Sequence, residues 1–104
     1  MYVSARRNEE EGVASRNELV EIFTEITDFE EMRSFIEEIL TPREIKDFSL
    51  RWKLLQELYE GNTQRNIAAQ YGISLCKITR GSKILKKNNS TTKKMLDRYH
   101  GGEK

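Results

Sequence analysis

The sequence predicts an all-α fold of six helices. Its apolar residues recur at steps of three and four, which is the spacing of one face of an α-helix, and no stretch alternates strictly as a half-buried strand does. Pro42 is the one proline among 104 residues, so helices can run without interruption. We expect a loose N-terminal arm over residues 1–14, where apolar surface is scarce, and a single helical domain over residues 15–104.

Three predicted helices fill residues 15–60, and each starts at a capping signal. A capping box pairs a Ser or Thr with a Glu three residues later, so that each side chain bonds to the other residue's backbone. The matching pairs are Ser15 with Glu18, Thr27 with Glu30, and Thr41 with Glu44. Pro42 strengthens the third start, because proline suits the first helical position. Gly61 is expected to end the third helix in a left-handed conformation.

The first two of these helices carry broad apolar faces for so small a chain. The faces comprise Leu19, Ile22, Phe23 and Ile26 on the first, and Phe29, Met32, Phe35, Ile36, Ile39 and Leu40 on the second. Such faces need a partner surface, so we expect residues 15–60 to be dimerisation helices that pair with a second copy of the chain. Trp52 lies on the apolar face of the third helix and is expected in the core.

Residues 63–87 have the pattern of a helix-turn-helix. Thr63 and Ser74 are predicted to cap the two helices, and Gly72 suits a tight turn that needs a positive φ. Ala68 is small enough for two helices to cross closely, and the expected buried residues are Ile67, Ile73 and Ile78. A final helix is predicted over residues 91–100.

The net charge of +1 conceals two oppositely charged halves. Residues 1–60 carry 15 acidic and 8 basic side chains, a net charge of −7, whereas residues 61–104 carry 2 acidic and 10 basic ones, a net charge of +8. A basic half that contains a helix-turn-helix indicates double-stranded DNA as a partner. The predicted DNA-contacting residues are Gln64, Arg65, Ser74, Leu75, Cys76, Lys77, Thr79, Lys83 and Lys86.

Composition argues against several other classes of protein. No apolar run approaches the ~20 residues of a membrane span, and the first residues lack the apolar core of a secretory signal, so we expect no membrane partner and a cytoplasmic location. With only Cys76 and His100, the chain has too few side chains for a disulfide framework, a zinc cluster or a histidine-based triad. We therefore expect no catalytic residues, no metal and no enzyme activity.

Residues from about 35 to 87 resemble the core of the bacterial tryptophan repressor family. The most specific matches are Leu40-Thr41-Pro42, Arg51, Gly61, Gln64-Arg65 and the run Ile78-Thr79-Arg80-Gly81-Ser82. The resemblance implies an intertwined all-helical homodimer that represses tryptophan-related genes by binding operator DNA. It implies no cofactor other than L-tryptophan, which would act as a corepressor beneath the second helix of the motif.

The resemblance also implies a ligand site. In the family, a threonine and an arginine hold the ligand carboxylate and a second arginine covers the indole ring; these fall on Thr41, Arg80 and Arg51. The whole implied ligand set is Leu40, Thr41, Arg51, Arg80, Gly81 and Ile84. The chemistry is sensible in itself, because guanidinium groups both stack on aromatic rings and grip carboxylates.

Two positions depart from the family pattern and leave alternatives open. Ile84 stands where the family has a serine that contacts the ligand's amino group, and Lys83 replaces an asparagine. One alternative is therefore a helix-turn-helix regulator of the same fold with a different effector, such as an indole acid without an amine, or with none. Another is a dimeric interaction module whose basic half binds an acidic protein.

Overall fold

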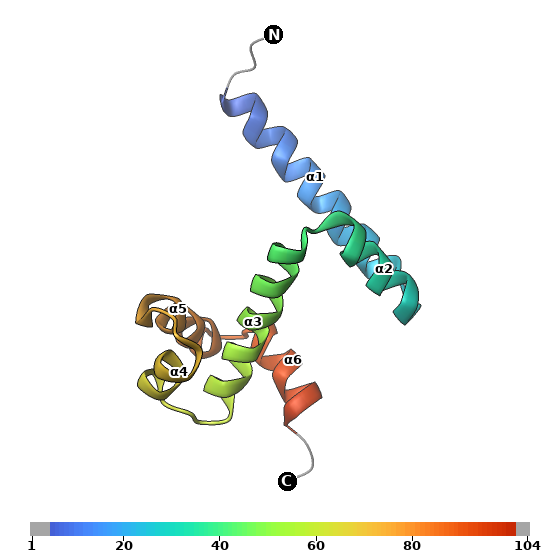
Figure 1. Ribbon diagram of the computed structural model, residues 1–104. Coiled ribbons are helices and arrows are strands. Elements are labelled where there is room, and N and C mark those ends of the chain that lie inside the picture. Colours follow the sequence, from blue (N-terminus) through green and yellow to red (C-terminus); the bar gives the residue numbers. More distant parts are fainter. Residues whose placement is uncertain (1–4, 102–104) are drawn as a thin grey trace. The chain divides into compact units, whose positions relative to one another are not determined.

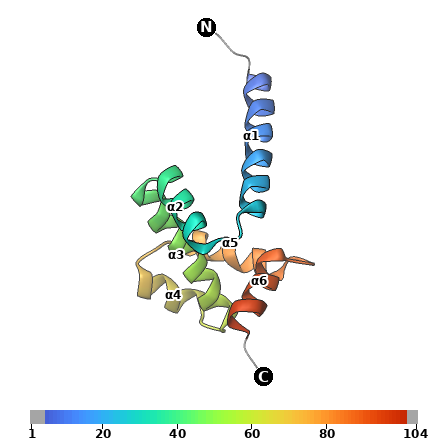
Figure 2. The ribbon, with the colours of Figure 1, turned by 90° about the vertical axis from the view of Figure 1, so that its right-hand side faces the viewer.

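The computed structural model describes residues 5–101, with side chains from residue 8 onward, and confirms the all-α prediction there (Figures 1 and 2). Within that range there are six α-helices and no strand. They are α1 (Ala5–Glu25), α2 (Phe29–Ile39), α3 (Pro42–Tyr59), α4 (Gln64–Tyr71), α5 (Leu75–Lys86) and α6 (Thr91–His100). The chain divides into two compact units between Ile45 and Lys46, inside α3, whereas a single domain is predicted over residues 15–104.

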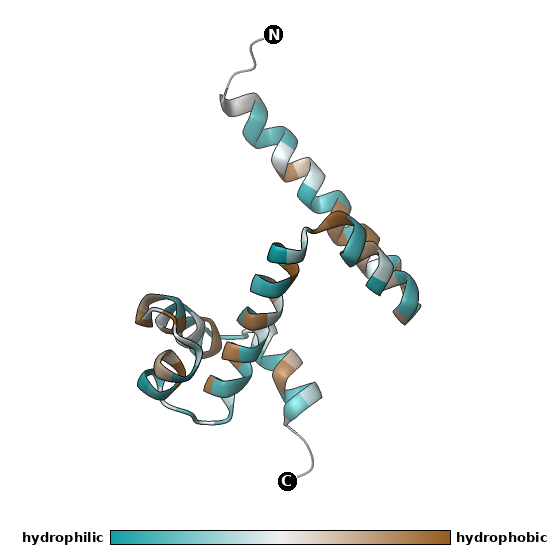
Figure 3. Cartoon of the chain, in the orientation of Figure 1, coloured by the Kyte–Doolittle hydropathy of each residue, from teal (hydrophilic) through white to brown (hydrophobic). Residues whose placement is uncertain are grey.

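The expected loose arm is wrong for residues 5–14, which form the first part of α1. Ser15 therefore lies inside this helix and does not cap it. The side chains described from residue 8 to residue 18 are all exposed, and this part of the helix is mostly hydrophilic (Figure 3). Alanine, arginine and glutamate have high helix propensity, which favours a helix in this exposed segment. Residues 1–4 of the predicted arm lie outside the described residues.

The N-terminal unit has little core of its own. The rings of Phe23 and Phe35 meet edge to face with their centroids 5.6 Å apart, a favourable aromatic geometry. None of the described residues of α1 and α2 is fully buried, and Phe29 is 74% exposed. The apolar faces predicted from the sequence are thus present, but a single chain leaves much of their surface uncovered.

The C-terminal unit has a distinct core built from three helices. Leu54 of α3, Ile67 of α4 and Ile78 of α5 form a buried cluster, flanked by Leu50, Leu58, Ala68, Tyr71 and Ile73. Leu96 of α6 is also fully buried. Tyr59 of α3 donates a 2.6 Å hydrogen bond to Asp97 Oδ1 of α6. The prediction that Trp52 lies in the core is wrong for the single chain, because Trp52 is 37% exposed and its ring lies 6.1 Å from that of His100.

The helix starts follow local side-chain chemistry. The Thr41–Glu44 capping box is complete: Glu44 N donates to Thr41 Oγ1 at 3.1 Å, and Thr41 N donates to Glu44 Oε1 at 2.9 Å. Thr63 caps α4 as predicted. The second predicted box is displaced by one residue, because Asp28 rather than Thr27 accepts the capping bond of α2, from Glu31 N. Asp28 has a stronger N-cap preference than threonine, which accounts for the shift.

Candidate helix-turn-helix and effector pocket

The segment from Thr63 to Lys86 folds as two packed helices joined by a tight turn. Gly72 ends α4 with φ of 64°, the left-handed conformation predicted for it, and its N–H donates to Ala68 O at 2.9 Å. Ile67 and Ile78 have no exposed surface, so they fix how α4 and α5 face each other. Ile73 follows the turn and packs half-buried against the same cluster. The three isoleucines expected between the helices therefore all contribute to this core.

Burying Ile78 exposes other side chains of α5 to solvent. Leu75 is 47% exposed, and Cys76 and Lys77 are exposed as well. The other predicted DNA-contacting residues that are exposed are Arg65, Ser74, Lys83 and Lys86. Gln64 and Thr79 differ, because both are half-buried and Thr79 Oγ1 donates a 3.0 Å hydrogen bond to Gln64 Oε1. This bond ties the start of α4 to the middle of α5.

A pocket of about 200 Å³ lies between α3 and α5. That volume is several times the roughly 30 Å³ of one water molecule, so a small organic ligand has room. A Cβ placed on Gly81 would come within 3.1 Å of Leu58 Cδ1 and 3.3 Å of Leu55 Cδ2, so the absence of a side chain there lets α5 approach α3 closely. The full lining is Asp47, Leu50, Arg51, Leu54, Leu55, Leu58, Ile73, Lys77, Ile78, Arg80, Gly81 and Ile84.

Four of the six residues of the predicted ligand site line this pocket together: Arg51, Arg80, Gly81 and Ile84. The other two, Leu40 and Thr41, belong to the N-terminal unit, where Thr41 caps α3.

Sequence reasoning missed two charged residues of the pocket. Asp47 was not considered, although it precedes Arg51 by four residues and so shares its helix face. Lys77 was assigned to DNA alone, yet it also lines the pocket, three residues before Arg80.

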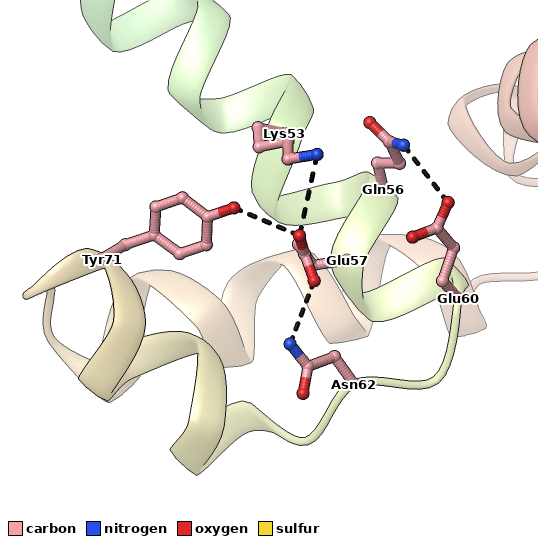
Figure 4. Close-up of polar contacts among 6 residues, drawn as sticks. All are labelled: Lys53, Gln56, Glu57, Glu60, Asn62 and Tyr71. Atoms are coloured by element: carbon pink, nitrogen blue, oxygen red, sulfur yellow. Dashed lines mark hydrogen bonds and ion pairs between the residues drawn. The ribbon is translucent and has the colours of Figure 1, made fainter.

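A polar cluster around Glu57 joins α3 to the helix-turn-helix (Figure 4). Glu57 Oε1 accepts a 3.0 Å hydrogen bond from Asn62 Nδ2, and Oε2 accepts one of 3.1 Å from the Tyr71 hydroxyl. Lys53 Nζ lies 3.7 Å from Oε2. The pKa of Glu57 is lowered below its ordinary value. The largest cause is the hydrogen bond from Asn62, and the hydrogen bond from Tyr71 and the positive charge of Lys53 act in the same direction. Asn62 lies two residues before α4 and Tyr71 is its last residue, so the ionised carboxylate holds both ends of that helix to α3.

Comparison with known proteins identifies the family to which this chain belongs. The family model described as Trp repressor protein matches residues 14–100, which include α2 to α6 and most of α1. The chain belongs to the Trp repressor family. Members of this family are regulators rather than enzymes, so the chain is a repressor-type regulator. The resemblance drawn from residues 35–87 is thereby confirmed and extends over most of the chain.

Several curated members of the Trp repressor family are similar to this chain, and each is named a Trp operon repressor homolog. The protein of Xylella fastidiosa is 36% identical over 72 residues, 68% of this chain and 78% of the relative. That of Chlamydia trachomatis is 43% identical over 56 residues, 53% and 60% of the two chains. That of Vibrio campbellii is 31% identical over 80 residues, 76% and 80%. No solved structure gave a significant match.

The described residues were also searched for membrane-spanning helices and for clusters of metal-binding side chains. In that part of the chain, no helix is both long and apolar enough to cross a membrane. Nor do any three His, Cys, Asp or Glu side chains within the described range lie where they would hold a metal ion together.

Proposed function

We propose that this member of the Trp repressor family binds operator DNA as a homodimer, with L-tryptophan as its corepressor. The observation that carries the proposal is the double role of α5. Its Arg80 and Gly81 line the pocket, whereas Leu75 and Cys76 near its start are exposed. A ligand in the pocket therefore touches the same helix that would enter the major groove, so its binding energy can favour one orientation of that helix.

The charge distribution supports DNA as the partner. Exposed basic side chains lie at the start of α4 and along the second half of α5, at Arg65, Lys83 and Lys86. Each phosphate that such a side chain neutralises releases condensed counterions and steepens the salt dependence of binding by about 0.9 in log–log slope. The net charge of +8 in residues 61–104 gives the helix-turn-helix half a strong attraction for the DNA backbone.

Uncovered apolar surface supports the homodimer. Large apolar side chains of the N-terminal unit stand exposed in the single chain, namely Val13, Val20, Phe23, Phe29 and Ile39. Soluble chains seldom leave such surface open unless another molecule covers it. A second copy presents the same faces, and two recognition helices related by two-fold symmetry would enter successive major grooves about 34 Å apart.

The pocket supports an aromatic carboxylic acid as the effector. Its lining consists mostly of leucine and isoleucine side chains, and Arg51 and Arg80 line it from different helices. One guanidinium can stack on an indole ring while the other binds the carboxylate. L-tryptophan has both groups.

Ile84 favours a second candidate, a regulator of the same fold with another effector. Its side chain lines the pocket and offers no hydrogen-bond acceptor to a ligand's amino group. An indole acid without the amine would lose nothing there.

The test is DNA selection followed by titration. A random duplex library is enriched on the full chain with and without millimolar L-tryptophan, and the enriched duplex is titrated by fluorescence anisotropy under both conditions. We expect affinity to rise with tryptophan. Arg65→Ala should reduce the salt slope by about one, whereas Arg33→Ala, on α2, should leave it unchanged. Enrichment of no duplex would refute DNA binding, and equal affinity in both conditions would refute the corepressor.

A further inference from the structure

The connection from α5 to α6 and the outer side of α6 carry exposed positive charge that lies outside the helix-turn-helix. Lys87 directly follows α5, Lys94 and Arg98 lie on α6, and all three side chains are exposed. We call these three residues the α6 basic surface. None of them belongs to the predicted DNA-contacting set, but Lys83 and Lys86 of that set lie in the last turn of α5, next to this surface in the chain.

The burial of Leu96 places the α6 basic surface on the solvent side of that helix. Leu96 is fully buried, and Lys94 and Arg98 lie two residues before and two residues after it. A step of two residues turns by about 200° around a helix of 3.6 residues per turn, so both cations point away from the core. Because they are four residues apart, they also share one face of α6.

The charge of this surface is not neutralised by acidic side chains of the described residues. Residues 83–98 contain six basic residues and a single acidic one, Asp97. Asp97 is already engaged, because its Oδ1 accepts the 2.6 Å hydrogen bond from Tyr59 and its Oδ2 lies 3.4 Å from Lys93 Nζ. Among the ion pairs of the described residues, none includes a residue of the α6 basic surface.

The position of Lys94 is unfavourable for the stability of α6. A helix carries partial positive charge at its amino end, so acidic side chains stabilise that end and basic ones destabilise it. The first turn of α6 contains no acidic residue, and its third and fourth residues are Lys93 and Lys94. Lys93 is offset by its ion pair with Asp97, whereas Lys94 is not. Departures from such local rules are expected where a residue serves a function, and a bound polyanion would relieve this repulsion.

Duplex DNA is the polyanion that suits an exposed row of cations rather than a pocket. It carries one negative charge for about every 1.7 Å of its axis, so cations spread over two elements can follow its backbone. The helices α5 and α6 are in contact, and α6 begins five residues after α5 ends. The α6 basic surface therefore continues the exposed cations of α5.

We propose that the α6 basic surface binds phosphates of the operator duplex outside the base pairs that α5 would read. This inference rests on the proposed function, because it extends the DNA interface of the repressor beyond the helix-turn-helix. Contacts of this kind carry no sequence information; they add affinity and fix the position of the protein on the duplex.

The test compares two duplexes by fluorescence anisotropy over a range of salt concentrations. The short duplex is the sequence enriched in the selection described above, and the long one adds about ten base pairs of arbitrary sequence, roughly one helical turn, at each end. The full-length proteins are the wild type, Lys94→Gln/Arg98→Gln, the charge-retaining Lys94→Arg/Arg98→Lys and the control Arg33→Gln/Lys46→Gln. The control removes two positive charges from exposed residues of α2 and α3.

We expect the wild type, the charge-retaining variant and the control to bind the long duplex more tightly than the short one. Lys94→Gln/Arg98→Gln should bind both duplexes about equally. On the long duplex its log–log salt slope should fall by about 1.8 per protomer, at about 0.9 for each lost phosphate contact. Its midpoint in urea should not fall, because both side chains are exposed and Lys94 opposes the helix dipole, so unfolding would not explain weaker binding.

Equal binding of the two duplexes by the wild type would overturn the role of the α6 basic surface, and so would a preference for the long duplex that survives in Lys94→Gln/Arg98→Gln. Both results would leave binding of the short duplex by the helix-turn-helix intact. An equal loss in Arg33→Gln/Lys46→Gln would overturn it as well, because net charge alone would then account for the effect. Enrichment of no duplex would instead remove DNA binding itself, and with it this extension of the interface.

Discussion

Substitutions on the two sides of α5 should affect different properties, folding stability on one side and DNA binding on the other. Ile78 has no exposed surface and packs with Ile67 and Leu54, whereas Leu75, three residues earlier, is 47% exposed. The paired substitutions Ile78→Ala and Leu75→Ala therefore remove apolar side chains of similar size from opposite environments on one helix. We expect the first to lower the free energy of unfolding and the second to lower the affinity for DNA.

The magnitudes follow from burial. Ile78→Ala removes three carbon atoms from a fully buried side chain, worth about 0.8 kcal/mol each in transfer free energy, and leaves a cavity that adds to this loss. The expected cost is about 2–5 kcal/mol. Leu75→Ala should cost about 0.5 kcal/mol or less in stability, as surface substitutions do. Loss of its apolar contact with a base should weaken DNA binding by about 1 kcal/mol, or roughly fivefold.

Urea unfolding followed by circular dichroism measures the first effect, and anisotropy on the selected duplex measures the second. All proteins must be compared at one concentration, because the stability of a dimer depends on it. The midpoint for Ile78→Ala should fall with an unchanged slope, which marks a change in stability alone. The assignment of the two faces would be refuted if Leu75→Ala destabilised the chain as much as Ile78→Ala, or if it left DNA affinity intact.

Three further predictions concern other parts of the chain. Thr41→Ala should lower the stability by about 1 kcal/mol in urea unfolding because Glu44 N loses its cap, and Thr41→Ser should restore it. The lowered pKa of Glu57 contributes stability that is present above its ordinary value of 4.5 and is lost as pH falls through the lowered value; Glu57→Gln should remove that part of the pH dependence of the urea midpoint. Phe29→Asp should weaken dimerisation at least tenfold in sedimentation experiments, whereas Glu31→Gln on the same helix should not.

Local rules were sufficient for much of the fold. The Thr41–Glu44 capping box, the cap at Thr63 and the left-handed Gly72 each depend on residues within a few positions of one another, and the structure confirms all three. The helix-turn-helix core was also predictable, because Ile67 and Ile78 hold the inward positions of the two helices on either side of that turn. Sequence patterns are informative wherever the interaction that decides the structure is short in range.

The sequence predictions failed where the structure depends on contacts between residues distant in the chain, or where a helix forms without an apolar face. Helical periodicity identified the apolar face that carries Trp52 but not what covers it, and within one chain its ring stays partly exposed beside His100. Asp47 lies between Lys46 and Phe48 in the sequence, and only the approach of α5 makes it part of a pocket. The early start of α1 has a different cause: apolar patterning is absent there, and residues of high helix propensity favour the helix.

The helix α3 links dimerisation to DNA binding, the two roles proposed for the halves of the chain. Its first residues, with the complete capping box, belong to the unit whose exposed apolar faces would join two copies. Its later residues, from Asp47 to Leu58, form one wall of the pocket, and α5 forms the other. A ligand held between Arg51 and Arg80 therefore adds contacts between a helix that begins in the dimerising unit and the helix that would read DNA. In the proposed function, effector binding would change DNA affinity only as far as those contacts differ between two orientations of α5. On that proposal the pocket residues, rather than the DNA-facing ones, would determine the regulation.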